Sequence, residues 1–202
     1  MKQLDKMYDI IFEDERLKKL FLNFHTDNWV LLDTDDKYLI IDEINTIVAE
    51  LYGYEPNKIN KVDTNFYGYQ SSFSWEIAIG EESLENDCGY EIIDTYFHEL
   101  RHAFQNRAME GKLTPLESVD EDLLDKWNRN FAPGNYISNS QEYYMWQYVE
   151  RDAWTTGMLF AYRVYKLNKE TIPTIDEEWK NYCERHRDTF NYLISENEKA
   201  IE

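Results

Sequence analysis

The chain has 202 residues, and its 40 acidic against 21 basic residues give a formal net charge of −19 at pH 7. A field of this sign repels phosphate backbones, so we expect no nucleic-acid partner, and solubility is the simplest consequence of the charge. Apolar residues make up 43% of the sequence and aromatic residues 16%, which is typical of a folded globular protein and excludes a disordered chain.

The cysteines and the apolar segments indicate a compartment and a domain count. Cys88 and Cys183 are the only cysteines, and without a secretory signal pattern we expect both to be reduced. No apolar run approaches the roughly eighteen residues that a membrane helix requires, so we expect a cytoplasmic protein with no membrane partner. Only 4 prolines and 7 glycines leave little room for linkers, which predicts one domain over residues 1–202.

Residues 1–57 are predicted to be helical. Apolar residues at spacings of three and four indicate a helix, or a broken pair of helices, over residues 4–24. A second amphipathic helix is predicted over residues 39–51, ending near Gly53. His25 lies where the first pattern runs out, and we expect it in an exposed loop.

Residues 58–111 are predicted to combine a sheet with a helix. Apolar and polar residues alternate over residues 73–80, which is the period of a strand, and shorter strands are predicted at 59–63 and 67–71. Turn residues between these short segments favour hairpins. We therefore expect an α+β protein that is predominantly helical, with one small, mainly antiparallel sheet before the next helix.

That helix carries the pattern H-E-x-x-H. Its apolar residues recur at spacings of three and four, between a start near Gly89 and an end near Gly111. The pattern is His98-Glu99-Leu100-Arg101-His102. Residues four apart share one helix face, so both imidazoles can bind one zinc ion. Glu99 follows the first histidine, where it can take a proton from a water on that ion.

Asp94, just before the motif, and Arg101, within it, each have two candidate roles. Asp94 lies four residues before His98 on the same face. It either orients that imidazole or is a first-turn carboxylate favoured by the helix dipole. Arg101 points away from the two histidines, and it is either a surface residue or a support for the ligands.

Residues 112–202 are predicted to form three further helices. Their expected ranges are 114–129, 140–166 and 175–199. Capping patterns mark their starts, formed by Thr114 with Glu117, Asn139 with Glu142 and Thr174 with Glu177. His186 lies among charged residues of the last helix, and we expect it on a solvated face rather than at a metal.

A zinc site needs a third protein ligand, and Glu150 is the preferred candidate. It lies on the second of these helices near small residues such as Gly157, which would let this helix approach the His98 helix closely. A buried carboxylate without a partner is costly, and zinc would be that partner. Asp152, about 200° around the helix from Glu150, is a rival, and Glu142 is a weaker one.

The motif, followed about fifty residues later by Glu150-Arg151-Asp152-Ala153, resembles the gluzincin type of zincin metallopeptidase. In that type a glutamate on a downstream helix, often in E-x-x-A, is the third ligand. The compact arrangement is similar to small bacterial and phage-borne zincins, including the ImmA/IrrE-type regulatory peptidases. The resemblance covers residues 71 to about 161. The sequence departs from it at Trp154, because several gluzincins carry Asp directly after the alanine.

The resemblance implies a zincin-like fold and a zinc metallopeptidase. The implied zinc ligands are His98, His102 and Glu150, with Glu99 as the general base for hydrolysis of a peptide or protein substrate. It also implies that the strand at 73–80 holds extended peptide at a sheet edge, although an ordinary buried strand fits the same pattern.

The donor to the tetrahedral oxyanion stays open, and the candidates are Tyr136, Tyr143, Tyr148 and His186. The alternative function is a catalytically silent zincin-fold protein that binds or regulates a partner through its acidic surface. Trp154 in place of an acid favours this alternative. Glu99 favours the enzyme, because a scaffold has no use for a base beside the metal.

Overall fold

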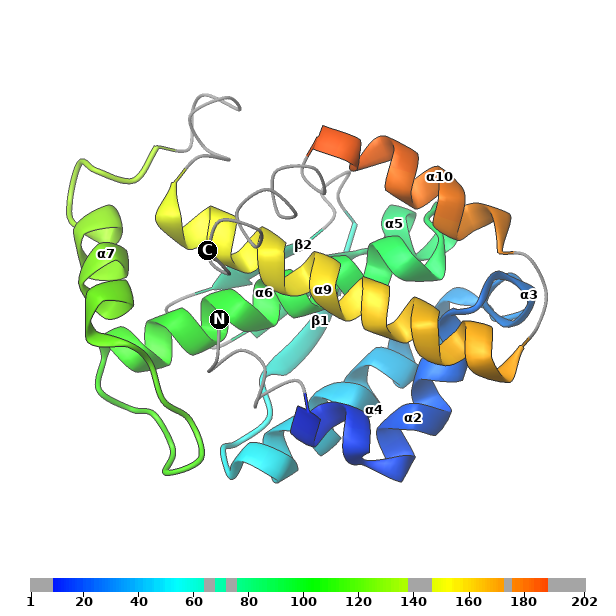
Figure 1. The fold of residues 1–202 in the computed structure, drawn as a ribbon, viewed down its shortest axis with the longest axis horizontal. Helices are drawn as coiled ribbons and strands as arrows, with labels where there is room; N and C mark the ends of the chain where they lie inside the picture. Colours follow the sequence, from blue (N-terminus) through cyan, green and yellow to red (C-terminus); the bar gives the residue numbers. More distant parts are fainter. Residues whose placement is uncertain (1–8, 64–67, 72–75, 138–146, 173–175, 189–202) are drawn as a thin grey trace, which may run out of the picture.

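The computed structural model describes residues 9–63, 68–71, 76–137, 147–172 and 176–188. Most of them lie in helices, which accompany one small sheet (Figure 1), so the α+β class is confirmed at this level. The elements in chain order are α2 (Glu15–Phe21), η1 (Leu22–Phe24), α3 (Thr26–Trp29), α4 (Thr34–Tyr52), β1 (Lys58–Val62), β2 (Gly68–Ser71), β3 (Glu76–Gly80), α5 (Glu81–Asn86), α6 (Gly89–Met109), α7 (Glu121–Phe131), α9 (Tyr148–Thr171) and α10 (Glu177–Arg185).

The N-terminal helices are bounded by capping residues, of which Gly53 was predicted. Residues 9–13 are helical, and the chain then breaks at Asp14, whose side chain accepts hydrogen bonds from two backbone N–H groups at the start of α2. The broken pair of helices is therefore confirmed. α4 begins after Asp33, which caps it in the same way, and ends at Gly53 with φ of 74°, a left-handed conformation that glycine adopts without a Cβ clash.

His25 is buried, so the prediction of an exposed loop histidine is wrong. Only 2% of its surface is exposed. Its Nδ1 accepts a hydrogen bond from the backbone N–H of Asp27, and its Nε2 lies 3.6 Å from Asp176, the residue that caps α10. Thr26 and Tyr90 donate hydrogen bonds to the same carboxylate. The burial depends on a contact with a residue some 150 positions away, which local pattern does not reveal.

The sheet is mixed, so the prediction of a mainly antiparallel sheet is wrong. Its strand order is β1-β3-β2, in which β3 is parallel to β1 and antiparallel to β2. The register pairs Ile59 with Ile77 on one side of β3 and Tyr69 with Ala78 on the other. β3 takes the central place because residues 77–80 are all buried, a pattern typical of a strand covered on both faces.

The central position of β3 also decides which strand has a free edge. Because β3 is paired on both sides, residues 76–80 cannot hold a peptide by backbone pairing, and the edge role implied for residues 73–80 is wrong for them. Residues 72–75 lie outside the described part of the chain. β2 is the strand at the edge of the sheet nearer α6.

α6 and α9 pack as an antiparallel pair in the middle of the molecule. In Figure 1, α9 lies in front of α6 and the sheet lies behind it. Tyr90 at the start of α6 contacts Tyr165 near the end of α9, whereas Gln105 near the end of α6 reaches Val149 at the start of α9. This opposite order fixes the direction of the pair.

Gly157 sets the closeness of this pair. A Cβ at Gly157 would lie 2.1 Å from Oδ1 and 2.5 Å from the carbonyl oxygen of Asp94, so no larger residue fits. Nearby, the rings of Phe97 and Phe160 stack with centroids 3.5 Å apart. The close approach of the two helices, predicted from Gly157, is confirmed.

The start of α7 differs from its prediction. Glu117 does accept a hydrogen bond from the backbone N–H of Thr114, as in a capping pattern. It also forms an ion pair with Arg107 of α6, and the chain remains non-helical until Asp120 caps α7. The tertiary ion pair outweighs the local capping signal, so the predicted start at Thr114 is wrong.

The last two helices also start later than predicted. α9 begins at Tyr148, because Gln147 is extended, and not at residue 140. α10 begins after Asp176, whose carboxylate accepts a hydrogen bond from the N–H of Trp179. Three predicted capping residues lie outside the described part, namely Asn139, Glu142 and Thr174.

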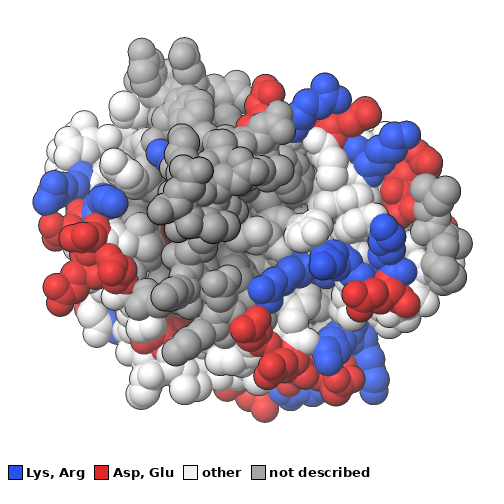
Figure 2. Space-filling model, in the orientation of Figure 1, with Lys and Arg blue, Asp and Glu red and all other residues white. Residues whose placement is uncertain are grey.

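The buried apolar residues form two clusters. One large apolar cluster joins the N-terminal helices, the sheet, α6, α9 and α10, and a smaller one joins α6, α7 and the start of α9. On the face shown in Figure 2, Lys and Arg side chains lie among Asp and Glu side chains.

Within the described ranges, no helix combines the length and apolar character needed to cross a bilayer. Cys88 and Cys183 are free thiols.

Candidate metal centre

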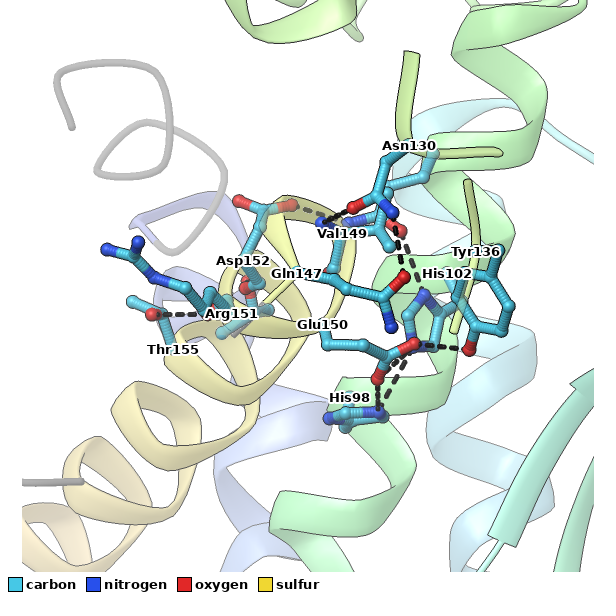
Figure 3. A network of polar contacts seen from close by, with 12 residues as sticks. His98, His102, Asn130, Tyr136, Gln147, Val149, Glu150, Arg151, Asp152 and Thr155 are labelled. Carbon is cyan, nitrogen blue, oxygen red and sulfur yellow. Dashed lines mark hydrogen bonds and ion pairs between the residues drawn. The ribbon is translucent and has the colours of Figure 1, made fainter. Parts of the chain in front are cut away.

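Three potential ligand atoms converge between α6 and α9. The Nε2 atoms of His98 and His102, one turn apart on α6, are 3.1 Å from each other. Oε2 of Glu150, in the first turn of α9, lies 3.6 Å from the first and 3.4 Å from the second (Figure 3). Ligands at 2.0–2.1 Å from a tetrahedral zinc ion lie about 3.3 Å apart. The three side chains predicted to share a metal are therefore brought together at a matching spacing.

The Glu150 carboxylate supplies a test of whether these residues fit a cation. Its side chain is completely buried, and Tyr136 donates a hydrogen bond of 2.7 Å to Oε1. Among the described residues, Oε2 has no hydrogen-bond donor, and it faces the two imidazoles. A buried carboxylate oxygen without a donor is costly, and a cation between the three atoms would remove that cost. The residues fit a divalent metal.

The pKa values of the three groups depend on one another. Burial lowers the pKa of His98, and the neighbouring His102 lowers it further. For His102, burial opposes the charged form, but contact with Glu150 outweighs this and raises its pKa. Burial likewise opposes ionisation of Glu150, and contact with His102 outweighs it, so the pKa of Glu150 is lowered. One ionised carboxylate beside two imidazoles is the donor set that zinc takes.

Glu99 lies next to this group on α6. It is buried, with 7% of its surface exposed, and its carboxylate lies with the ligand atoms of His98 and His102 within 4.8 Å of one another. β2 packs against the same side of α6, where a Cβ at Gly68 would lie 2.8 Å from Thr95 and 3.4 Å from Glu99. Gly68 therefore allows the edge strand to approach the position of the predicted general base.

His102 is oriented by a residue that the motif does not include. Oε1 of Gln105 lies 2.8 Å from Nδ1 of His102, and Nε2 of Gln105 donates to the carbonyl of Val149 and to Asp152. Because the amide nitrogen is committed to these two acceptors, the amide oxygen accepts the Nδ1–H. This leaves the Nε2 lone pair of His102 free to face a metal.

Asp152 is committed to Arg101 and is not a ligand. Its carboxylate forms a bidentate ion pair with Arg101, at 2.7 and 3.0 Å, in a largely buried position. Figure 3 shows Glu150 pointing to the two histidines and Asp152 pointing away from them. Arg101 is 4% exposed, so its prediction as a surface residue is wrong, and it supports the site through Asp152 and Gln105. The other rival, Glu142, lies outside the described part.

Tyr136 is the oxyanion candidate that lies at the site. Its hydroxyl bonds to Glu150, and its loop is fastened to the start of α9 by Gln147, whose amide pairs with the backbone of Ile137 and with Asn130. The other candidates are placed elsewhere. Tyr148 is 52% exposed at the start of α9, His186 contacts Glu91, and Tyr143 lies outside the described residues.

His98 is held differently from His102. Its Nδ1 is buried and, within the described ranges, has no hydrogen-bond partner. The ring of Trp154, one turn after Glu150 on α9, meets the His98 ring edge to face, with centroids 4.6 Å apart and planes at 66°. The residue at which the sequence departs from the gluzincin pattern therefore contacts a predicted ligand.

A second group of potential ligands, which we name the Glu91 cluster, consists of Glu91, Asp94 and His186, with ligand atoms within 4.8 Å of one another. Each carboxylate has protein donors. Glu91 is 2.7 Å from Arg185 and 2.9 Å from His186, and Asp94 accepts a hydrogen bond from Tyr182. His186 is thus partly buried against α6, and the prediction of a solvated face is wrong.

Asp94 takes neither of its two predicted roles. Glu91, not Asp94, is the acid in the first turn of α6, and in the described part of the chain no contact joins Asp94 to the His98 imidazole. Burial raises the pKa of Asp94 to about 7, although the Tyr182 hydroxyl lowers it. Oδ1 of Asp94 is buried without a donor among the described residues, and it packs against α9, where a Cβ at Gly157 would lie 2.1 Å from it.

Comparisons with family models, with curated proteins and with solved structures found no match to this chain.

Three residues that support the site were not singled out from the sequence, namely Gln105, Gln147 and Asn130. The sequence gives one signal for Gln105, a polar residue on an otherwise apolar helix three positions after a predicted ligand. The sequence gives no such signal for Gln147 or Asn130.

Proposed function

We propose that this chain is a zinc-dependent peptidase in which His98, His102 and Glu150 hold the ion and Glu99 is the general base. One observation carries the proposal, namely the triangle of ligand atoms with sides of 3.1, 3.4 and 3.6 Å around a buried carboxylate oxygen. The resemblance to gluzincins in the motif and in E-x-x-A supports the same ligand set.

The chemistry follows from the positions of the chain's own groups. When bound, zinc would lower the pKa of a coordinated water toward 7 and polarise the scissile carbonyl. Glu99 takes the proton of the attacking water and passes it to the leaving amine. The Tyr136 hydroxyl donates its one proton to Glu150 in this structure, and it would have to turn from Glu150 to the oxygen on which charge develops in order to stabilise it.

We assign substrate binding to the edge of β2. Extended peptides add to a free sheet edge by backbone hydrogen bonds. β2 lies at the edge of the sheet and against the Glu99 side of α6, where Gly68 keeps the strand close to the base. A peptide or protein chain paired with β2 would pass the metal centre in extended form.

The alternative is a zincin-fold binding protein without turnover. Trp154, which stands where several gluzincins carry an acid, favours it. Two features favour the enzyme. Glu99 lies buried beside the histidines, where a scaffold needs no carboxylate, and Tyr136 places a hydroxyl donor at the same site.

The test is cleavage of a peptide library by zinc-loaded protein, with Glu99→Gln as the matched control. We expect cleavage by the wild type and a rate lower by roughly 10²–10⁴ in the variant, because the base is lost while the ligands remain. Zinc content measured on the same samples should be equal. Equal cleavage by both proteins, or none by the zinc-loaded wild type, would refute the proposed peptidase.

A further inference from the structure

The two imidazoles of the metal centre differ in how their second nitrogen is satisfied. Nδ1 of His102 donates to Gln105, which is fixed in turn by Val149 and Asp152. Nδ1 of His98 is buried and, within the described residues, has no acceptor. Metal-binding imidazoles almost always donate this second N–H to a carboxylate, carbonyl or water, which fixes the ring and raises its basicity. No residue in the described part of the chain gives His98 this support.

Trp154 covers the ring that lacks support. It lies four residues after Glu150, so its side chain projects from the same face of α9 toward α6. Its ring meets His98 edge to face, at 4.6 Å between centroids. The indole N–H is a donor only, and it is itself buried without a partner in the described part of the chain. Trp154 therefore packs against His98 but cannot accept its proton.

We propose that Trp154 is a positioning residue that holds His98 by ring contact alone, making His98 the weaker ligand and zinc binding readily reversible. This inference rests on the metal centre proposed above and concerns its regulation. The zinc occupancy of the protein would then follow the free zinc concentration. The neighbouring acid Asp152 cannot replace the missing acceptor, because it is committed to Arg101 and Gln105.

The test compares zinc affinities measured by chelator competition. In Trp154→Asp and Trp154→Asn the new side chain carries an oxygen that can accept the Nδ1–H of His98, and we expect zinc to bind about 10–100-fold more tightly. Trp154→Phe is the matched control, because it keeps an aromatic ring but adds no acceptor, and its affinity should stay close to that of the wild type. Circular dichroism establishes that each variant is folded.

A second measurement needs no variant at position 154. In a proton–nitrogen NMR spectrum of the zinc-loaded wild type, the ring N–H of His102 should appear at the low field of a hydrogen-bonded imidazole and move in Gln105→Ala. The ring N–H of His98 should appear at higher field. Two equally low-field protons would overturn the inference, as would folded Asp and Asn variants that bind zinc no more tightly than the wild type. A wild type that takes up no zinc would refute the metal centre itself, and with it this inference.

Discussion

α6 carries two groups of potential metal ligands, and they differ in what balances their charge. In the Glu91 cluster Arg185 and His186 contact Glu91, and the Tyr182 hydroxyl donates to one oxygen of Asp94. In the metal centre Glu150 receives one hydroxyl, and its second oxygen has no donor among the described residues. Proximity of three ligand residues therefore does not define a metal site. Both groups contain a buried carboxylate oxygen without a donor among the described residues. Oε2 of Glu150 faces two imidazole nitrogens at 3.4 and 3.6 Å, whereas Oδ1 of Asp94 packs against Gly157 of α9, and this position separates the metal centre from the Glu91 cluster.

Metal removal should separate the two groups most strongly. A ligand present at about a thousand times its dissociation constant stabilises a fold by about 4 kcal/mol, so chelation should lower the melting temperature of the wild type by roughly 10 °C. The same fall is expected for Glu91→Gln, because its cluster binds no metal. Glu150→Gln should melt at one temperature with and without chelator. Thermal melts of the three proteins check this, and a chelator effect lost in Glu91→Gln would reverse the assignment.

Removal of the Tyr136 hydroxyl should act on the reaction at the metal centre. We expect Tyr136→Phe to lower kcat by roughly 10²–10³, with KM little changed, because an oxyanion donor acts only in the transition state. Steady-state kinetics on zinc-loaded protein measure both constants. If the variant instead loses zinc and keeps its kcat once zinc is restored, Tyr136 positions Glu150 and does not contact the substrate.

Gln105 should matter for metal affinity and not for the Glu91 cluster. Gln105→Ala removes the acceptor that orients His102, and we expect zinc affinity to fall about 10–100-fold. Gln105→Glu keeps an acceptor and should retain more of the affinity than the alanine variant. Chelator competition measures both. Equal affinities in the wild type and the alanine variant would show that His102 needs no support.

The Glu91 cluster should respond to pH with a smaller effect. Burial opposes protonation of His186, but contact with Glu91 outweighs it and raises its pKa. The stabilisation is therefore full below the unfolded-state pKa and is lost as pH rises through the higher folded-state value. We expect the free energy of unfolding of the wild type to exceed that of His186→Gln by about 1 kcal/mol near pH 6 and by little near pH 9. The contribution of Asp94 to stability also falls as pH rises, because burial raises its pKa. Urea unfolding is therefore compared between the two proteins at each pH, since both contain Asp94. A gap that widens with pH would contradict this ion pair.

The sequence predicted the parts of the site that depend on local spacing. His98, Glu99 and His102 follow from the period of one helix, and Gly157 predicted the close approach of α9. Glu150 could be named only through ligand chemistry and a resemblance. The prediction of Glu150 therefore had a weaker basis than the prediction of the two histidines.

What the sequence did not predict depends on contacts between distant segments. Arg101 and Asp152 are 51 residues apart, and nothing in their local pattern indicates that they bind each other. The sheet was predicted as mainly antiparallel because short consecutive strands favour hairpins, yet β3 lies between β1 and β2. His25 and His186 were placed in solvent for the same reason, since the residues that cover them come from other helices.

The most direct test is the zinc content of zinc-loaded protein, measured by native mass spectrometry in wild type, His98→Ala, Glu150→Ala and Glu91→Ala. The account predicts one zinc ion per chain in the wild type and in Glu91→Ala, and none in the other two variants. Zinc retained by Glu150→Ala, or lost from Glu91→Ala while that variant remains folded, would contradict the claim that the buried Glu150 carboxylate facing the two imidazoles marks the metal centre.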